Sequence, residues 1–437
     1  MRKLIFVGLA QALLLLGGCG GGGSGVAPVG SKGGGSGTPP PPVPASNVVA
    51  MTVDAGPNAT STSSYDVDTP FITVTVCAPG STTNCQQIDH VEVDTGSFGL
   101  RLISSVLTPS VASALRQELS TTGNPLVECT QFIDGFSWGP VKVADVRIAG
   151  ESASSVPMQV IGDPSFQNEI PAACSGTGPE EDTVKEFGAN GILGVGPFGD
   201  DCGAGCASKP DNTFYYTCPA NGTSGCGGIA AAEADQVTNP VVFFATDNNG
   251  VIVQLPSVPE AGTPTTAGSL IFGIGTEGNN GLNNAIVLTA DPNTGDITTT
   301  YKNASLSRSF FDTGSNAFYF DDSSIPTCPT SGTSTVKSSW FCPTSTLSLT
   351  ATNTGRNGTV SNVTFEVANA DTLFKSSPVN TAFDNLGANA GNQSSFCPNS
   401  VADCAFDFGL PFFFGRSVYV AIGGANTSGG PGPYFAY

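Results

Sequence analysis

Two copies of one tetrapeptide hold the residues of this chain that are best suited to chemistry. They are Asp94-Thr95-Gly96-Ser97 and Asp312-Thr313-Gly314-Ser315. Each copy follows an apolar, strand-like run, and Asp and Gly favour turns over strand interiors, so each Asp should lie at the tip of a turn. Two carboxylates brought to one cleft share a proton, because like charges at short range cannot both ionise easily. One copy alone would indicate an ordinary turn. Two copies, each after an apolar strand, predict that Asp94 and Asp312 form a pair that activates water without a metal ion.

Other catalytic chemistries have little support in the sequence. His90 is the only histidine, so a His-Glu-x-x-His zinc motif is excluded and a nucleophilic triad would have to use this one residue. We expect His90 to be a solvent-facing or packing residue of a strand. No glycine-rich phosphate loop links a strand to a helix, and the net charge of −20 disfavours binding to nucleic acid or to anionic lipid. We therefore expect no cofactor and no metal.

The elements that must position the two Asp residues are predicted to be strands. Only 11% of residues are charged, and short apolar or alternating runs recur between Gly, Pro and Asn. This pattern predicts an all-β chain, with a few short helices at 110–119, 229–236 and 371–375. The roughly 390 residues after the amino-terminal region exceed the size at which a single core stops growing, so two lobes are expected.

The amino terminus has the pattern of an export signal. A basic start, an apolar run over 4–16 and the stretch Leu16-Gly17-Gly18-Cys19 resemble the lipobox of bacterial lipoproteins, in which the cysteine becomes lipidated. A plain secretory signal with an accidental cysteine is the alternative. Residues 20–46 are rich in Gly, Ser and Pro and are expected to form a tether. No Asp follows Cys19, and this resembles the pattern of lipoproteins that are sorted to the outer membrane. We expect the protein to face either the periplasm or the cell surface. We expect lipid to be the only link to a membrane.

The thirteen cysteines also indicate an exported protein. After Cys19, twelve remain, and an even number in an exported chain predicts disulfides. Four cysteines in a glycine-rich region, Cys202, Cys206, Cys218 and Cys226, are predicted to pair among themselves, either nested or sequentially. A zinc site is the competing interpretation for these four, although they lack a CxxC pair and a nearby histidine. The other predicted pairs are Cys77 with Cys85, Cys129 with Cys174, Cys328 with Cys342, and Cys397 with Cys404.

Six motifs in a fixed order carry a resemblance to a known family. They are the strands 71–74 and 88–93 before Asp94, the hairpin 135–148, the stretch 190–196, the strand 268–273, the tetrapeptide 312–315, and 408–413 with 418–419. From about residue 65 to 437 the chain resembles a pepsin-like aspartic peptidase. The resemblance implies a bilobal all-β fold with a cleft between two similar lobes, 47–262 and 263–437. It also implies a monomer that hydrolyses peptide or protein substrates as an endopeptidase.

The same resemblance assigns roles within the two tetrapeptides. Asp94 and Asp312 would hold the attacking water, one acting as base and the other as acid. The threonines, Thr95 and Thr313, would cross-bond the two turns. The glycines, Gly96 and Gly314, would let backbone amides approach the carboxylates. The serines, Ser97 and Ser315, would hydrogen-bond the outer carboxylate oxygens.

The chain departs from the family pattern at the hairpin expected to cover the cleft. The hairpin is assigned to Phe132, Gly135, Phe136 and Trp138, and its usual tyrosine falls on Phe132. The tryptophan that normally partners this tyrosine is replaced by Arg101. Phenylalanine covers a cleft but donates no hydrogen bond, so a second function stays open. This alternative is a pepsin-like binding module for peptide or cell-wall glycan, with little or no turnover.

Overall fold

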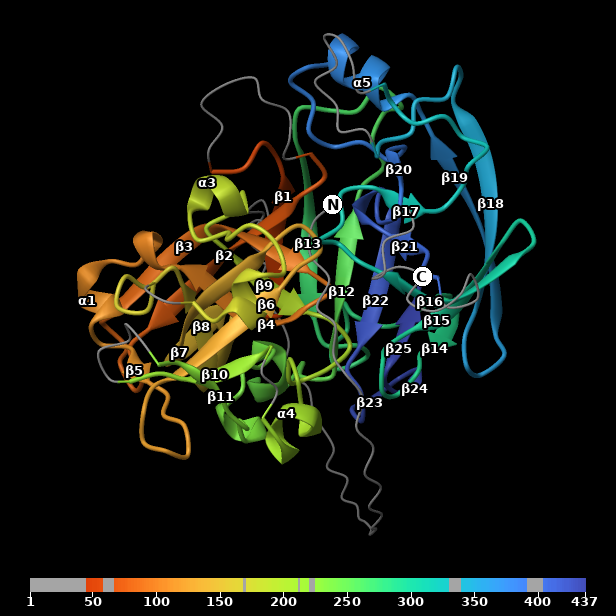
Figure 1. Cartoon of the computed structure of the whole chain (residues 1–437). Helices are drawn as coiled ribbons and strands as arrows, with labels where there is room; N and C mark the ends of the chain where they lie inside the picture. Colours follow the sequence, from red (N-terminus) through yellow and green to blue (C-terminus); the bar gives the residue numbers. More distant parts are fainter. Residues whose placement is uncertain are drawn as a thin grey trace, which may run out of the picture.

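The computed structural model describes residues 45–57, 67–167, 170–210, 213–219, 225–329, 339–390 and 404–437. Strands dominate these ranges, and the predicted all-β class is confirmed. The amino-terminal half lies on one side of the molecule and the carboxyl-terminal half on the other, with β1, β12, β13 and β22 between them (Figure 1). None of the helices in the described ranges has both the length and the apolar character that a membrane span requires. Cys19 and most of the predicted tether lie outside the described residues.

The amino-terminal half contributes twelve strands. They are β1 (Val48–Val53), β2 (Pro70–Cys77), β3 (Cys85–Asp94), β4 (Phe98–Ile103), β5 (Arg116–Gln117), β6 (Leu126–Gln131), β7 (Phe136–Ile148), β8 (Glu151–Ile161), β9 (Gly191–Val195), β10 (Tyr215–Thr217), β11 (Gly227–Gly228) and β12 (Gly250–Leu255).

The carboxyl-terminal half contributes the rest. They are β13 (Thr266–Phe272), β14 (Val287–Thr289), β15 (Ile297–Tyr301), β16 (Ala304–Phe311), β17 (Phe318–Phe320), β18 (Leu347–Thr354), β19 (Val360–Val367), β20 (Gly387–Asn389), β21 (Asp407–Phe408), β22 (Arg416–Ala421), β23 (Asn426–Thr427), β24 (Gly430–Pro431) and β25 (Tyr434–Ala436).

Helices in the described residues are short. The α-helices are α1 (Pro109–Ala112), α2 (Ala172–Ser175), α3 (Val184–Phe187), α4 (Ala204–Ser208) and α5 (Ala370–Ser376), and the 3-10 helices are η1 (Ser104–Val106), η2 (Glu233–Asp235), η3 (Pro240–Phe243) and η5 (Leu410–Phe412). The helix predicted at 371–375 is confirmed as α5, whose Asn369 side chain accepts from the Thr372 amide as a cap. The predictions at 110–119 and 229–236 are wrong beyond one turn, because the first segment turns into β5 and the second holds only η2.

Two large sheets organise the molecule. A 16-stranded sheet runs in the order β11-β10-β6-β7-β8-β4-β9-β3-β2-β1-β13-β12-β22-β25-β14, with β5 paired to β7. A 7-stranded sheet in the carboxyl-terminal half has the order β19-β18-β15-β16-β21-β17-β20. The predicted lobe boundary at residue 262 falls between β12 and β13, which are hydrogen-bonded neighbours. The two halves therefore share one continuous sheet.

The core of the carboxyl-terminal half is built from phenylalanine. Phe320 and Phe406 stack with ring centroids 4.8 Å apart, and Phe406 and Phe408 stack at 4.3 Å. Phe311, the last residue of β16, stacks on Phe408 at 4.9 Å and is fully buried. Alternate residues of a strand face opposite sides of its sheet, so the residues of β16 and β21 that alternate with these phenylalanines face away from the aromatic layer. Asp312 is the next residue in the sequence after Phe311.

Five disulfides join described cysteines. The pairs are Cys77–Cys85, Cys129–Cys174, Cys202–Cys206, Cys218–Cys226 and Cys328–Cys342. The four clustered cysteines thus pair sequentially, which rules out the zinc interpretation because none of the four thiolates is free to bind a metal. Cys404 is also disulfide-bonded, while its predicted partner Cys397 lies outside the described residues. Disulfides at this density indicate an oxidising, extracytoplasmic compartment.

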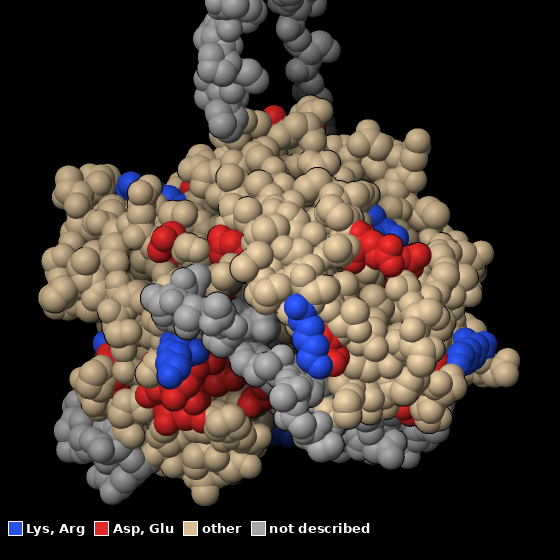
Figure 2. All heavy atoms as spheres, turned by 90° about the horizontal axis from the view of Figure 1, so that it is seen from above, with Lys and Arg blue, Asp and Glu red and all other residues tan. Residues whose placement is uncertain are grey.

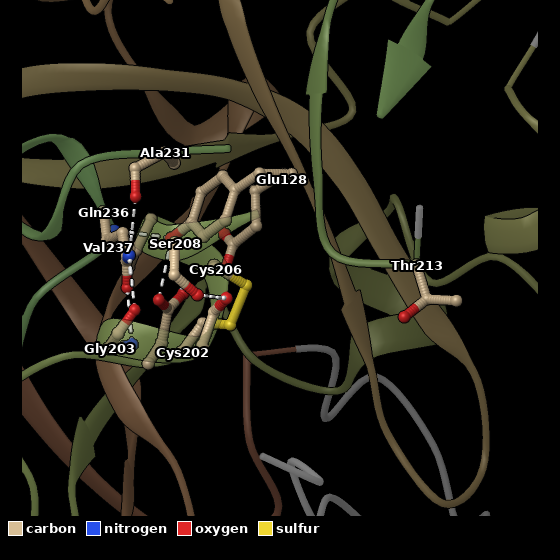
Figure 3. Close-up of a disulfide and its surroundings, with 12 residues drawn as sticks. Glu128, Cys202, Gly203, Cys206, Ser208, Thr213, Ala231, Gln236 and Val237 are labelled. Carbon is tan, nitrogen blue, oxygen red and sulfur yellow. Dashed lines mark hydrogen bonds between the residues drawn. A yellow bond between two sulfur atoms is a disulfide. The ribbon is translucent and has the colours of Figure 1, made fainter. Parts of the chain in front are cut away.

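The Cys202–Cys206 disulfide closes a small loop that one glutamine holds in place. The Gln236 amide nitrogen donates to the carbonyl oxygens of Gly203 and Ala231, each at 2.9 Å (Figure 3). Its side-chain oxygen accepts from the Gly203 amide at 2.6 Å. These bonds hold the loop closed by Cys202 and Cys206 against the segment that contains Ala231 and Gln236.

We expect protein purified under oxidising conditions to show no free thiols in the twelve cysteines after Cys19. Peptide mass spectrometry without reduction should recover Cys202 linked to Cys206, and Cys218 linked to Cys226. A nested pairing of these four, or free thiols at most positions, would contradict the disulfide arrangement.

Candidate active site

Two equivalent strand ends carry the tetrapeptides to one place. In the amino-terminal half, β3 ends at Asp94 and pairs in parallel with β9, so that Asp94 lies opposite Gly194. In the carboxyl-terminal half, β16 ends at Phe311 and pairs in parallel with β21, opposite Phe408. A Cβ atom at Gly194 would lie 2.4 Å from the Phe98 amide nitrogen, so only glycine allows the chain to pass so close to the first turn.

Reciprocal hydrogen bonds between the two threonines lock the turns together. The Thr95 amide donates to Thr313 Oγ1 at 3.1 Å, and the Thr313 amide donates to Thr95 Oγ1 at 3.0 Å. Each hydroxyl in turn donates to a carbonyl across the junction, Thr95 to Phe311 at 2.9 Å and Thr313 to Val93 at 2.6 Å. All four donors and acceptors are buried, so the bonds are shielded from competing water.

Each carboxyl group packs against the glycine of the opposite turn. A Cβ atom at Gly96 would lie 2.6 Å from Asp312 Cγ, and one at Gly314 would lie 2.8 Å from Asp94 Cγ. The Gly96 amide donates to Asp94 Oδ1 at 2.7 Å, and the Gly314 amide donates to Asp312 Oδ1 at 2.8 Å. The two glycines therefore have two roles. Their amides donate to the carboxyl groups, and their lack of a side chain leaves room for the carboxyl group of the opposite turn.

The protonation state of the pair follows from its burial. Asp94 and Asp312 have no exposed surface. Burial raises the pKa of Asp312 well above its usual range, and the charges of Asp94 and Asp407 and a hydrogen bond with Asp94 raise it further, while the Gly314 amide opposes them. Burial and the neighbouring carboxyl groups thus favour the protonated form of Asp312, the form that a general acid requires.

The two serines are not equivalent. The Ser315 hydroxyl donates to Asp312 Oδ2 at 2.9 Å, as the sequence predicts. Neither Ser97 Oγ nor Asp94 Oδ2, both buried, has a hydrogen-bond partner in the described part of the chain. The predicted bond from Ser97 to Asp94 is therefore not formed in this structure.

A third buried aspartate, Asp407, lies beside the pair and was missed by the sequence analysis. It is the first residue of β21, and the charges of Asp94 and Asp407 both act on Asp312. The available signal was an acidic residue inside the apolar run 405–414, where a buried charge needs a reason. Within the described ranges, no group of three or more Asp, Glu, His or Cys side chains has a metal-binding arrangement, so the three carboxyl groups do not form a metal site here.

The four residues predicted to cover the cleft pack inside the amino-terminal half instead. Phe132 is 5% exposed and contacts Phe187 edge-on, in a hydrophobic cluster of that half. The Trp138 indole donates to the Phe166 carbonyl at 2.7 Å and packs on Tyr216. These rings are core residues, and the prediction that they face substrate is wrong.

The other two members of the predicted hairpin are enclosed as well. Phe136 is 2% exposed in the cluster around Trp138, and a Cβ atom at Gly135 would lie 2.5 Å from the Pro179 carbonyl oxygen. Ile133, between β6 and β7, packs instead against a cluster of the carboxyl-terminal half that contains Tyr319. The hairpin therefore does reach across to the other half, through a residue that the sequence analysis did not select.

Arg101 is the centre of a buried ion network. Its guanidinium donates to Glu128 Oε1 at 2.6 Å, to Asp201 Oδ2 at 3.0 Å and to the Phe98 carbonyl at 2.6 Å. The Tyr215 hydroxyl donates to Asp201 Oδ1 at 2.7 Å. Burial raises the pKa of Asp201 well above its usual range, the neighbouring Glu128 adds to this, and Arg101 opposes it. Arg101 thus joins β4 to Glu128 of β6 and to Asp201, beside the Cys202–Cys206 loop.

Comparison with known proteins places the chain in a family without assigning an activity. A search of curated proteins finds no significant match. A family model covers residues 43–437, which include both tetrapeptides and all the strands described above. The chain belongs to the family described as "Protein of unknown function (DUF3443)".

Proposed function

We propose that this protein is an aspartic-type endopeptidase that hydrolyses peptide bonds with a water molecule held between Asp94 and Asp312. The observation that carries the proposal is the reciprocal threonine bonding, which holds two buried carboxyl groups face to face across the junction of the two halves. The raised pKa of Asp312 favours its protonated form, which supports the acid role for this residue. Asp94 acts as the base and Asp312 as the acid.

The reaction needs no group beyond these two carboxyls and water. Asp94 removes a proton from the water, whose oxygen attacks the scissile carbonyl carbon, while Asp312 donates its proton to the carbonyl oxygen. The resulting tetrahedral diol collapses, the carbon–nitrogen bond breaks, and the leaving amine takes the proton that Asp94 holds. The return of a diol proton to Asp312 restores the starting state.

The test is cleavage of a denatured protein or a mixed peptide library between acid and neutral pH. Because the pair is active only with one proton shared, the rate should be bell-shaped in pH, with limbs that belong to the pair as a unit. The buried, apolar setting of Asp312 raises the upper limb, since it disfavours the doubly ionised state. A pepstatin-type inhibitor should bind and abolish the cleavage.

The second candidate is a binding module for peptide or cell-wall glycan, with little turnover. The hairpin from β6 to β7 contains no tyrosine, and the Trp138 indole is already bonded to Phe166, so the usual hydroxyl donor over the cleft has no replacement among these residues. If a folded wild type cleaves nothing at any pH yet binds peptide or glycan, this second function replaces the first.

For its location, we propose a lipoprotein of the outer membrane, lipidated at Cys19. Replacing Cys19 with Ser should release the protein from membranes into the soluble periplasmic fraction, because one cysteine carries the whole anchor. Fractionation and immunoblotting of wild type and Cys19→Ser test this, with thermal unfolding to confirm that the variant is folded. Unchanged membrane association of the folded variant would overturn the lipid anchor.

A further inference from the structure

A pocket of about 250 Å³ lies beside α1 in the amino-terminal half. Its apolar walls come from separate parts of the chain, namely Leu107, Ala112, Leu115, Val160 and Pro164. Leu107, Leu115 and Val160 are buried in the main hydrophobic cluster, so core packing fixes the inner wall. Ala112 and Pro164 are exposed, so the pocket is open to solvent. Its volume is slightly below the range of about 300–1,000 Å³ that is usual for drug-sized ligands, which suits a smaller molecule.

One lysine places its ammonium group in this apolar pocket. Lys142 of β7 is paired with Met158 of β8, and Val160 lies two residues further along β8, so Lys142 and Val160 face the same side of the sheet. The Lys142 side chain is 16% exposed and lines the pocket. Burial lowers the pKa of Lys142, and the charge of Asp163 opposes this. A ligand with a negative group would compensate the buried charge.

The ammonium group of Lys142 lacks the close partner that other lysines have. Asp163 Oδ2 lies 3.9 Å from Lys142 Nζ, which is too far for a hydrogen bond. By contrast, Lys302 Nζ and Lys375 Nζ lie 2.8 and 2.6 Å from their aspartate partners. Within the described ranges, no acceptor is hydrogen-bonded to Lys142 Nζ. The donors of this ammonium group are therefore available to a molecule in the pocket.

The second charged group of the pocket, Asp163, is held in place from its other side. Asp163 Oδ1 accepts from the Ser165 amide at 3.0 Å, while Oδ2 is the atom nearer to Lys142. A ligand carboxylate can bond to Lys142 and a ligand ammonium can bond to Asp163, and such charge-assisted bonds are strong. A simple carboxylate would be repelled by Asp163, and a simple amine would be repelled by Lys142. The pair therefore favours a ligand that carries both charges on neighbouring atoms.

The charge of the whole protein favours the same class of ligand. The chain has 15 Lys and Arg against 35 Asp and Glu, and its net charge is −20. The face in Figure 2 is made mostly of uncharged residues, with Lys and Arg in small scattered groups. Such a field repels small anions at long range, whereas a zwitterion has no net charge to be repelled.

We propose that this pocket binds a free α-amino acid with an apolar side chain, such as leucine. The ligand carboxylate bonds to Lys142, the ligand ammonium bonds to Asp163, and the apolar side chain packs against Leu107 and Leu115. None of the residues that line the pocket belongs to either Asp-Thr-Gly-Ser turn. The inference therefore stands or falls independently of the proposed peptidase function.

Calorimetric titration of the wild-type protein with leucine, leucinamide and 4-methylpentanoate tests the proposal. Leucine should bind with a Kd below about 1 mM. Leucinamide lacks the carboxylate and 4-methylpentanoate lacks the ammonium, so each should bind at least about tenfold more weakly through the loss of one charge-assisted bond. The absence of leucine binding at about 10 mM overturns the proposal. Equal affinity for leucine and 4-methylpentanoate overturns it too, because the site would then recognise a simple carboxylate.

Variants assign each end of the ligand to one residue. Lys142→Met should weaken leucine binding at least about tenfold, because it removes the partner of the carboxylate. Asp163→Asn should weaken leucine binding to a similar extent but should not weaken binding of 4-methylpentanoate, which has no ammonium. Ala112→Trp fills the pocket without removing a charge, and it should abolish leucine binding. Because Ala112 is exposed, this variant keeps the test valid even if Lys142→Met does not fold.

Lys302→Met is the matched control. It also removes an ammonium group that is paired with an aspartate, but in the turn between β15 and β16 of the carboxyl-terminal half. Its affinity for leucine should stay within about twofold of wild type, because distant sites act independently. Thermal unfolding confirms that each variant is folded. Equal leucine affinity in wild type, Lys142→Met and Ala112→Trp would place the binding elsewhere on the protein and overturn the proposal.

Discussion

Replacing Asp94 or Asp312 with Asn is expected to reduce kcat/KM by about 10³-fold or more while leaving the fold intact. A side-chain amide at position 94 cannot take the proton of the attacking water, and one at position 312 cannot transfer a proton to the carbonyl oxygen, so either change removes acid–base catalysis. Asn has the shape of a protonated Asp, and the Gly96 and Gly314 amides can still donate to its side-chain oxygen. Because burial raises the pKa of Asp312 and so penalises its ionised form, Asp312→Asn, which cannot ionise, should be at least as stable as wild type near neutral pH.

Asp296→Asn provides a comparison for these variants. Burial raises the pKa of Asp296 to about 6, so it is also a titrating, partly buried carboxyl group, but it lies outside the pair. Cleavage by this variant should stay within about twofold of wild type across the pH range. Equal cleavage by wild type, Asp94→Asn and Asp312→Asn would show that the activity belongs to a contaminant or to other residues.

Replacing Arg101 with Met is expected to lower the free energy of unfolding by about 3–5 kcal/mol, the cost of removing one partner from a buried ion network. Glu128 and Asp201 would then face each other with no cation between them, in a region with no exposed surface. Met keeps most of the side-chain volume, so the measured loss reports charge and hydrogen bonds more than a cavity. Urea unfolding of both proteins gives the difference.

The loss should depend on pH in a defined direction. The pKa of Asp201 is already raised in the folded state, and Arg101 is the group that opposes this rise, so its removal raises that pKa further. A carboxyl whose folded pKa lies above its unfolded value loses stability as pH increases between the two values. Arg101→Met should therefore be more destabilised at pH 7 than at pH 4.

Arg116→Met is the matched control for this network. The Arg116 side chain is 58% exposed and forms a surface ion pair with Glu118. Such pairs contribute about 1 kcal/mol or less, so this variant should unfold almost as wild type does. A similar small effect for Arg101→Met would contradict the buried network.

Several features were predictable because they depend on residues close in sequence. The turn at each Asp-Thr-Gly-Ser follows from strand and turn preferences, and Cys77 and Cys85, eight residues apart, bracket one hairpin. The all-β class followed from the short apolar runs. The short helices were harder, since the segment at 110–119 turns into β5 after one helical turn.

Contacts between distant segments were not predictable in the same way. Arg101 meets partners 27 and 100 residues away, and nothing local to its sequence distinguishes it from a surface arginine. Phe132 and Ile133 are neighbours near the turn of one hairpin, yet the first packs inward and the second across to the other half. Only the path of the backbone decides between these two directions.

The sequence by itself determined that this protein is an exported-type, disulfide-bonded β protein with two Asp-bearing turns. The tertiary structure decided that the turns meet, through threonine bonds that join residues 218 positions apart. It also decided that a third aspartate stands beside them, because the parallel pairing of β21 with β16 sets which face Asp407 occupies. A shift of one residue in that register would turn Asp407 into the phenylalanine core, since alternate residues of a strand face opposite sides.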